Sequence, residues 1–344
     1  MAARPRVGLY YDLRNAGDQP WQHRYAAALE QISAAEALGV DAIWLSEHHG
    51  FADGYLPAPL TFAAAVAART SRVRIGTAVV IAPLSPPMAL AEQAAVVDQL
   101  SGGRLELGLG AGWREAEFRA LGAEYRGRYT ALEHAVRTLP ELWRTGRATP
   151  PPAQQPVPLW VGARGPRGAR IAGRTGAGLL WLDHELLPPY REALLAAGHP
   201  PERARMGGLV NVFLADDPEA ARARIYPAGR RNRASYAGND RAITSAVTGA
   251  GAGAGAGAAV RREAAFPRLS IRTAAQAAEL VTERITGLPV TDVFCFADIG
   301  GLVQPGEPDR GAAELVARHV ELVAGTLPRL LTESRLGSHA DAAR

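Results

Sequence analysis

The chain has 344 residues, of which 47% are hydrophobic, and its formal net charge is +4, a length and composition that suit one large α/β barrel. A single cysteine excludes an internal disulfide, and all 38 basic residues are arginine, which excludes a lysine Schiff base and a P-loop ATPase. The arginines are not clustered, and no segment is apolar for long enough to span a bilayer or to act as a signal peptide. We therefore expect a cytoplasmic protein with no nucleic-acid or membrane partner.

Short apolar runs alternate along the chain with segments of helical periodicity. The predicted strands cover residues 7–11, 41–46, 73–81, 104–110, 158–162, 176–182, 207–215 and 291–297. The predicted helices cover residues 23–39, 59–70, 87–103, 114–121, 128–143 and 311–331. Because the alternation runs from end to end without a switch in pattern, it predicts a parallel sheet closed into a (β/α)8 TIM barrel. A doubly wound open sheet is the structural alternative.

The domain organisation follows from this alternation. We expect a single barrel domain over residues 1–335, with a long insertion at 216–290 between the seventh and eighth strands. The Gly/Ala-rich run 249–258 has no side chains to bury, which indicates a flexible surface loop rather than a lid. Residues 336–344 are predicted to be a disordered tail.

The second predicted strand ends in a cluster of polar residues, Ser46, Glu47, His48 and His49, and the C-terminal ends of barrel strands are where active sites lie. Because side chains alternate along a strand, one histidine should face the pocket and the other should pack or hydrogen-bond behind it. A pocket histidine can hold or donate a proton near neutral pH. The alternative is an N-cap or a loop ion pair with Glu47. The spacing of zinc-binding histidines is absent, so no metal site is predicted.

Two glycine-rich turns follow predicted strands. The turn in 108–118 does not match the dinucleotide fingerprint, so it is either a plain tight turn or a place where a flat ligand approaches the backbone. In 161–176 a strand ends in glycines and a proline before an arginine-rich helix. Its first backbone N–H groups, with Arg164 and Arg167, favour a phosphate site, and the alternative is a capped, solvated helix start.

Together these segments resemble the bacterial luciferase-like monooxygenase superfamily, whose members are (β/α)8 barrels that use reduced flavin or the deazaflavin F420. The resemblance covers residues 6 to 332 and is strongest over 36 to 122. The stretches that carry it are "GVDAIWLSEHH", "VRIGTAVVIAPLSPPMALAEQAAVVDQLSGGRLELGLGAGWREAEFRALG", "PLWVGARGPRGARIAGRTGAGLLW" and "ELVARHVELVAGTLPRLL".

The resemblance also implies roles for residues. It places His48, the first histidine of the EHH sequence, beside the reactive flavin carbon as a catalytic residue, with Glu47 next to it. It implies a non-proline cis peptide at Ala78–Val79 under the flavin ring. The cofactor-binding residues that it implies are Thr77, Ala78, Val79, Ala111, Gly112, Trp113, Ala163, Arg164, Gly165, Arg167 and Trp181.

This chain departs from luciferase itself at two positions. Ala111 stands where luciferase has an arginine for the phosphate group, and Gly110 stands where it has a cysteine near the flavin, so light emission is not implied. Arg164 and Arg167 are the candidates to replace the lost charge. Further arginines for an anionic cofactor tail are Arg170 and Arg114.

The function that the resemblance implies is a flavin-dependent monooxygenase. Reduced FMN would come from a separate reductase and react with O₂ to give a C4a-peroxide that oxidises a small organic substrate. Trp44, Trp113, Trp181 and Phe296 are candidates for the apolar walls that keep water away, and the alternative for each is an ordinary core residue. The alternatives are an F420-dependent oxidoreductase that transfers hydride and a non-catalytic flavin-binding protein, against which the intact EHH sequence argues. The resemblance further implies a homodimer.

Overall fold

The computed structural model describes residues 4–15, 20–227, 269–298 and 310–333. The Gly/Ala-rich run 249–258 and the tail 336–344 lie outside these ranges. Within them, no helix combines the length and the apolar character needed to cross a membrane.

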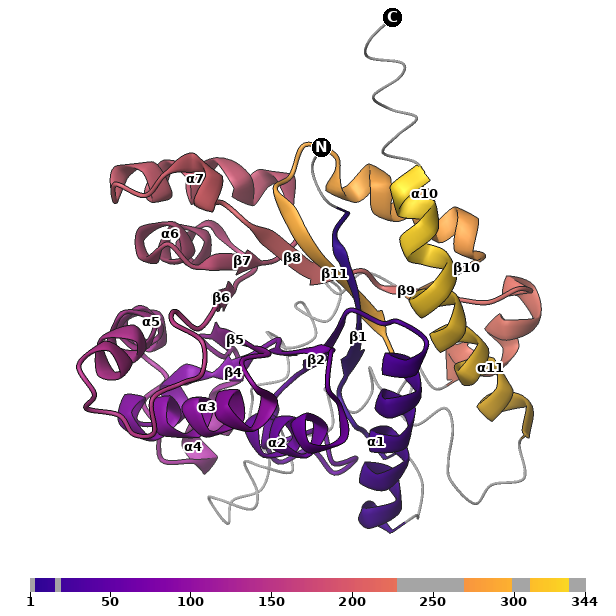
Figure 1. The fold of residues 1–344 in the computed structure, drawn as a ribbon, viewed down its shortest axis with the longest axis horizontal. Coiled ribbons are helices and arrows are strands. Elements are labelled where there is room, and N and C mark those ends of the chain that lie inside the picture. The colour runs from indigo at the N-terminus through magenta and orange to yellow at the C-terminus, as the bar shows by residue number, and fades with distance from the viewer. Residues whose placement is uncertain (1–3, 16–19, 228–268, 299–309, 334–344) are drawn as a thin grey trace, which may run out of the picture.

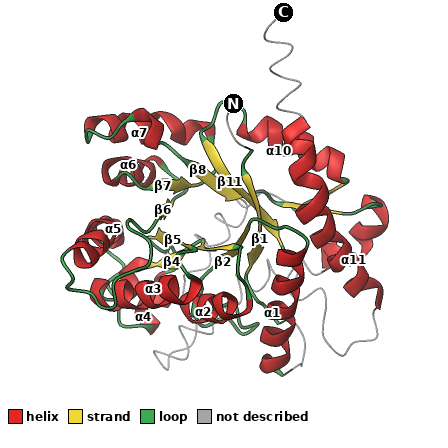
Figure 2. Cartoon of the chain, viewed as in Figure 1, coloured by secondary structure: helices red, strands yellow, loops and turns green. Residues whose placement is uncertain are grey.

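The strands form one closed ring with the helices outside it (Figure 1, Figure 2). The hydrogen-bonded order is β3-β2-β1-β11-β8-β7-β6-β5-β4, and a further pairing between β3 and β5 closes the barrel. Every pairing in the ring is parallel. Because β3 and β4 follow each other in one strand position, the barrel has eight strand positions. The predicted TIM barrel is confirmed, and the open doubly wound sheet is wrong.

The barrel strands are short and buried along most of their length, as expected for parallel strands covered on both faces. Their bounds are β1 (Arg6–Tyr11), β2 (Ala42–Leu45), β3 (Arg74–Thr77), β4 (Val80–Ile81), β5 (Leu105–Gly110), β6 (Leu159–Gly162), β7 (Gly178–Leu180), β8 (Met206–Leu209) and β11 (Val290–Phe296). Two further strands, β9 (Val212–Leu214) and β10 (Ser270–Arg272), pair with each other outside the ring.

The helices pack their apolar side chains against the barrel. Several begin with proline in the first turn, where the missing N–H costs nothing, and α3 and α6 end at glycines with positive φ. Their bounds are α1 (Trp21–Ala37), α2 (Pro59–Arg69), α3 (Pro87–Ser101), α4 (Glu115–Ala120), α5 (Arg128–Arg144), α6 (Pro166–Thr175), α7 (Leu187–Ala196), α10 (Ala274–Ile285) and α11 (Arg310–Glu321).

Two predicted strands are interrupted in the structure. The predicted strand 73–81 is divided into β3 and β4 by the peptide Ala78–Val79, which is cis as the resemblance implied. The predicted strand 207–215 is divided into β8, which stays in the barrel, and β9, which leaves it to pair with β10. The region 216–290, expected to be largely irregular, therefore contains β10 and the helix α10 in its described part.

A fully buried histidine joins β9, β11 and α11. His319 on α11 accepts a hydrogen bond at Nδ1 from the backbone N–H of Leu214, 2.9 Å away, and donates one from Nε2 to the carbonyl oxygen of Phe296, 2.7 Å away. Its ring stacks on Phe213 with the centroids 4.0 Å apart. Both ring nitrogens are thus used by a neutral imidazole, and protonation of Nδ1 would place two N–H groups against each other.

This histidine should make the fold sensitive to acid. Burial lowers the pKa of His319 to about 4, although its two hydrogen bonds partly raise it. A histidine in the unfolded chain has a pKa near 6.5. Its stabilising contribution is complete above about pH 6.5 and is lost as the pH falls toward 4. The loss at pH 4.5 is about 2–3 kcal/mol. Urea denaturation at pH 7 and 4.5 measures it, and His319→Gln should flatten the difference. An equal pH dependence in both proteins would contradict this account.

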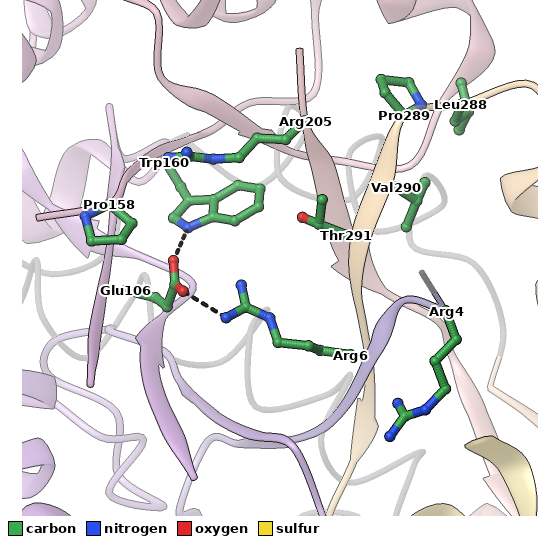
Figure 3. A pocket seen from close by; sticks show the side chains of 10 residues that line it. All are labelled: Arg4, Arg6, Glu106, Pro158, Trp160, Arg205, Leu288, Pro289, Val290 and Thr291. Carbon is green, nitrogen blue, oxygen red and sulfur yellow. Dashed lines mark hydrogen bonds and ion pairs between the residues drawn. The ribbon is translucent and has the colours of Figure 1, made fainter. Parts of the chain in front are cut away.

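The N-terminal ends of the strands carry an ionic cluster with buried carboxylates and partly exposed arginines (Figure 3). Glu106 at the start of β5 accepts hydrogen bonds from Arg6, Arg74 and the indole N–H of Trp160, each 2.8 Å long. Arg6 also pairs with Asp292 on β11. The cluster links strands on different sides of this end of the barrel, which we call the barrel floor. It lies far from the C-terminal strand ends, where a barrel site is expected.

Candidate active site

A cavity of about 420 Å³ opens at the C-terminal ends of the barrel strands. Residues at the end of every barrel strand position contribute to its wall, and this volume lies in the range of small-molecule sites. Its lining residues are Tyr10, Ser46, Glu47, His48, Tyr55, Ala78, Val79, Ile81, Gly110, Ala111, Gly112, Trp113, Arg128, Tyr129, Gly162, Ala163, Arg164, Leu180, Trp181, Leu209 and Phe294.

His48 lines the cavity and is held from behind by a buried carboxylate. Its Nδ1 lies 2.7 Å from Oε1 of Glu117 on α4, and the same oxygen accepts the backbone N–H of His49 and a guanidinium N–H of Arg114. Burial by itself raises the pKa of Glu117, but these hydrogen bonds and the neighbouring positive charges lower it below its ordinary value. Glu117 is therefore ionised, and it holds the His48 ring with Nδ1 as the donor, which leaves the proton chemistry of the ring to Nε2.

The second histidine and Glu47 have a supporting position. His49 Nε2 lies 2.7 Å from Oε1 of Glu47, and the other carboxylate oxygen accepts the backbone N–H of Ile81 at 2.8 Å. Glu47 thus ties the EHH loop to β4, directly after the cis peptide. The two histidines lie as strand alternation predicts: His48 lines the cavity, whereas His49 does not line it and hydrogen-bonds to Glu47. The alternative of an ion pair with Glu47 holds for His49 alone.

Two buried arginines brace the loop that carries His48. Arg114 lies 4.3 Å from the ring centroid of Phe51 and donates to Glu117. Arg14 lies 4.5 Å from the ring centroid of Tyr55 and pairs with Asp53 at 3.0 Å. Arg114 was a candidate for an anionic cofactor tail, but its guanidinium is buried against Glu117 on the histidine side of the site. Its role is to fix the loop.

The cis peptide Ala78–Val79 forms a bulge inside the cavity. The side chain of Val79 rests against two strand ends that carry no side chain, since a Cβ at Gly110 would lie 2.3 Å from Val79 and one at Gly162 would lie 2.4 Å from it. Gly110, where luciferase has cysteine, therefore makes room for the bulge. The two glycines and the bulge together present a surface that a flat ring can approach.

Replacing Gly110 with alanine should displace this bulge. The new methyl group would overlap Val79 at a distance that no pair of carbon atoms tolerates, and overpacking of this kind costs about 1–3 kcal/mol. We expect a matching loss in the free energy of unfolding, measured by urea denaturation, together with weaker cofactor binding. Gly325→Ala is the control, because its Cβ would meet nothing within 4 Å. Equal stability of the two variants would show that the bulge moves freely.

Positive charge gathers where α5 and α6 begin. Arg128 lines the cavity and donates to the carbonyl oxygen of Gly112 at 3.2 Å. Arg128 and Arg167 both lie against the ring of Tyr129, at 5.1 and 4.7 Å from its centroid. Arg164 lies 5.0 Å from the ring centroid of Trp181. Arg128 thus supplies a positive charge near Ala111, the position at which luciferase has an arginine and this chain has none.

The cavity lining also includes aromatic side chains and one pair of hydroxyl groups. The hydroxyl oxygens of Tyr10 and Tyr55 lie 3.1 Å apart. Tyr10 stacks on Phe294, and Tyr55 meets the His48 ring edge to face with the centroids 4.7 Å apart. Trp113 contacts His48 in the same way at 5.8 Å. The His48 ring is therefore packed against aromatic rings and is largely buried.

Most residues that the sequence singled out meet in this cavity. Among them are Glu47, His48, Ala78, Val79, Ala111, Gly112, Trp113, Ala163, Arg164 and Trp181. Thr77, Gly165 and Arg167 are not part of the lining; Thr77 is fully buried and exchanges hydrogen bonds with the backbone of Gly108.

Two candidates for the apolar wall, Trp44 and Phe296, are not part of the cavity lining. Trp44 is fully buried inside the barrel, and Phe296 packs edge to face against Tyr10. Sequence reasoning missed Tyr55, Glu117, Arg128 and Tyr129. Within the described ranges, no three His, Cys, Asp or Glu side chains are grouped as metal ligands.

Two relatives share about a third of their aligned residues with the chain. An F420-dependent glucose-6-phosphate dehydrogenase of Kineococcus radiotolerans is 31% identical over 241 residues, which are 60% of this chain and 71% of that protein. The oxygenase component of a flavin-dependent trigonelline monooxygenase of Acinetobacter baylyi is 30% identical over 188 residues, 50% of this chain and 52% of that protein.

Fold comparison and a family model agree with these relatives. The crystal structure of monooxygenase RslO1 from Streptomyces bottropensis superposes with a TM-score of 0.74 at 22% identity, covering 94% of this chain and 99% of that one. The family model described as luciferase-like monooxygenase matches residues 6–290. The chain therefore belongs to the luciferase-like monooxygenase family.

Proposed function

We propose that the protein is a flavin-dependent monooxygenase that uses reduced FMN and O₂ to oxidise a small organic substrate. The observation that carries the proposal is the position of His48, which an ionised, buried Glu117 holds at the wall of the same cavity as the Ala78–Val79 bulge. A separate flavin reductase belongs to the proposal, and the relative named as an oxygenase component supports it. The homodimer and the cytoplasmic location stay predictions.

The residues present fit FMN. The bulge and the side-chain-free positions Gly110 and Gly162 offer a surface for the planar ring system. Arg128 and Arg164 line the cavity, and two guanidinium groups match the charge of one phosphate group. This is the place that the sequence assigned to the phosphate, now with Arg128 in the role that Ala111 cannot fill.

Reduced FMN, when bound, would supply the electrons that activate O₂. The protein's part is to orient the ring on the bulge, to keep water out and to manage one proton. Tyr55 and Trp113 shield His48 from solvent, which protects reactive species from hydrolysis. With Nδ1 fixed by Glu117, Nε2 of His48 is the atom that would give or take the proton.

An F420-dependent oxidoreductase is the second candidate, and the dehydrogenase relative favours it. The anionic tail of F420 would need positive charge beyond the phosphate position. Arg167 and Arg170 are exposed on α6 and extend the basic surface away from the cavity. The same histidine, bulge and aromatic wall would then serve hydride transfer without O₂.

Anaerobic titration of the full-length protein with reduced FMN, and separately with reduced F420, tests the proposal. We expect reduced FMN to bind in the micromolar range, and O₂ added afterwards to give a transient absorbance band before oxidised flavin appears. Tight F420 binding without FMN binding would replace the proposal with the second candidate. Failure of both cofactors to bind would refute both.

The same titration tests Arg128. We expect Arg128→Gln to weaken reduced FMN binding by about ten- to a hundredfold, because a hydrogen bond to a charged group contributes about 1.5–3 kcal/mol. Arg126→Gln is the matched control, since Arg126 is exposed two residues earlier and does not line the cavity. If both variants lost the same amount of FMN affinity, Arg128 would contribute only through the general positive charge of the surface and not through a contact with the phosphate.

A further inference from the structure

A second cavity, of about 560 Å³, opens at the opposite end of the barrel. Figure 3 shows Arg205 lying along the indole ring of Trp160, with Thr291 across the opening and the apolar residues Leu288 and Val290 beside it. These residues come from the N-terminal ends of β6, β8 and β11. Neither the proposed function nor the family assignment gives this cavity a role.

The acidic residues at this cavity are already neutralised. Glu106 accepts three hydrogen bonds, two of them from the arginines Arg6 and Arg74. Asp292 pairs with Arg6 and accepts the hydroxyl of Thr291. Two carboxylates therefore face two guanidinium groups, and this part of the floor has no charge left over.

Arg205 adds a positive charge that no carboxylate pairs with among the described residues. One of its terminal nitrogens donates to the carbonyl oxygen of Leu159 at 2.8 Å, and its guanidinium lies 4.7 Å from the ring centroid of Trp160. Its Nε is buried and donates to no partner within the described ranges. Burial lowers the pKa of the Arg205 guanidinium, although the charges of Glu106 and Asp292 partly oppose that shift. A half-buried cation that forms no direct ion pair is costly unless an anion joins it.

We propose that the floor cavity binds a small organic monocarboxylate. Its carboxylate pairs with Arg205, and its apolar part lies against Leu288, Pro289 and Val290. One uncompensated positive charge matches a monoanion better than a phosphate dianion, and the apolar rim suits a carbon skeleton.

The floor cavity is separate from the candidate active site. Trp160, Trp44 and Phe294 form a column of aromatic rings through the barrel, with centroids 6.0 Å and 4.9 Å apart along it. Phe294 lines the upper cavity and Trp160 lines the lower one. Because these rings fill the interior between the two cavities, a ligand at the floor should not compete with a cofactor at the top.

Calorimetric titration of the full-length protein with benzoate, and with the neutral isostere benzamide, tests the proposal. We expect benzoate to bind at one site per chain and benzamide to bind at least about tenfold more weakly. Thr291→Glu places a negative charge in the opening at an exposed position and should weaken benzoate binding about tenfold. The isosteric Thr291→Gln should not.

Arg205→Gln should abolish the preference for benzoate over benzamide, whereas Arg191→Gln, which removes an exposed charge on α7, should keep it. Because Arg205 also supports β6 through Leu159, the Thr291 pair provides a test that leaves Arg205 in place. Equal binding of benzoate and benzamide would overturn the proposal. So would benzoate binding that both Thr291 variants leave unchanged, or that saturating FMN displaces. These results do not depend on whether FMN or F420 is the cofactor.

Discussion

Replacing His48 with alanine is expected to lower turnover by about 10²- to 10⁴-fold while the protein still folds and binds its cofactor. The reason is that the ring of His48 faces the cavity and its Nδ1 is held by Glu117, so Nε2 is set to exchange a proton. The alanine variant loses this group, whereas the bulge and the arginines that would hold the cofactor stay in place. Steady-state turnover and anaerobic cofactor titration, measured on the same preparation, separate the two effects.

His49 and His134 give this experiment its controls. His49 does not line the cavity and contacts Glu47, which is tied to Ile81, so His49→Ala should lower stability more than turnover per folded molecule. His134 is exposed on α5 and hydrogen-bonds to Thr138, so its replacement should change neither stability nor turnover. If His48→Ala retained its turnover, the histidine would be a structural residue, and the proposed proton transfer would fail.

The barrel could be predicted from the sequence because parallel strands covered on both faces appear as short apolar runs between helices. The two interruptions could not. Most of the residues from Thr77 to Ile81 favour a strand, so the local sequence gives no signal for the cis peptide at Ala78–Val79. Only the resemblance implied it. The departure of β9 depends on its partner β10, which lies more than fifty residues later, so no local signal encodes it.

The rule that barrel sites lie at the C-terminal ends of strands pointed to His48, and the resemblance pointed to the bulge. The rule could not locate Glu117 and Arg128, because both lie on helices and reach the site only through packing. Glu117 did have a weak signal, since it is a carboxylate next to the apolar Phe118 in a short helix directly after a strand-end turn. Arg128 begins α5 directly after Gly127, a place where a cation is as common on a solvated surface as at a phosphate group.

Replacing Glu106 with alanine is expected to lower the free energy of unfolding by about 2–4 kcal/mol. This is somewhat less than the cost of removing one partner from a fully buried ion pair, because Arg6 and Arg74 are partly exposed. The carboxylate is almost fully buried and joins Arg6 on β1, Arg74 on β3 and Trp160 on β6. Without it, Arg6 would keep only Asp292, Arg74 would keep no carboxylate partner, and the indole N–H would lose its acceptor.

Urea denaturation at pH 7 measures this loss, and Glu106→Gln distinguishes charge from hydrogen bonding. The amide keeps one acceptor oxygen for these donors but removes the negative charge, so its cost should lie between zero and that of alanine. Glu141→Gln is the matched control, since Glu141 pairs with Arg144 on the exposed surface of α5, where such pairs contribute little. A loss below about 1 kcal/mol for Glu106→Ala would mean that water replaces the carboxylate at the floor. Arg6 and Arg74 would then be solvated rather than paired. In that case Arg205 would no longer be the one cation at the described floor that lacks a carboxylate partner.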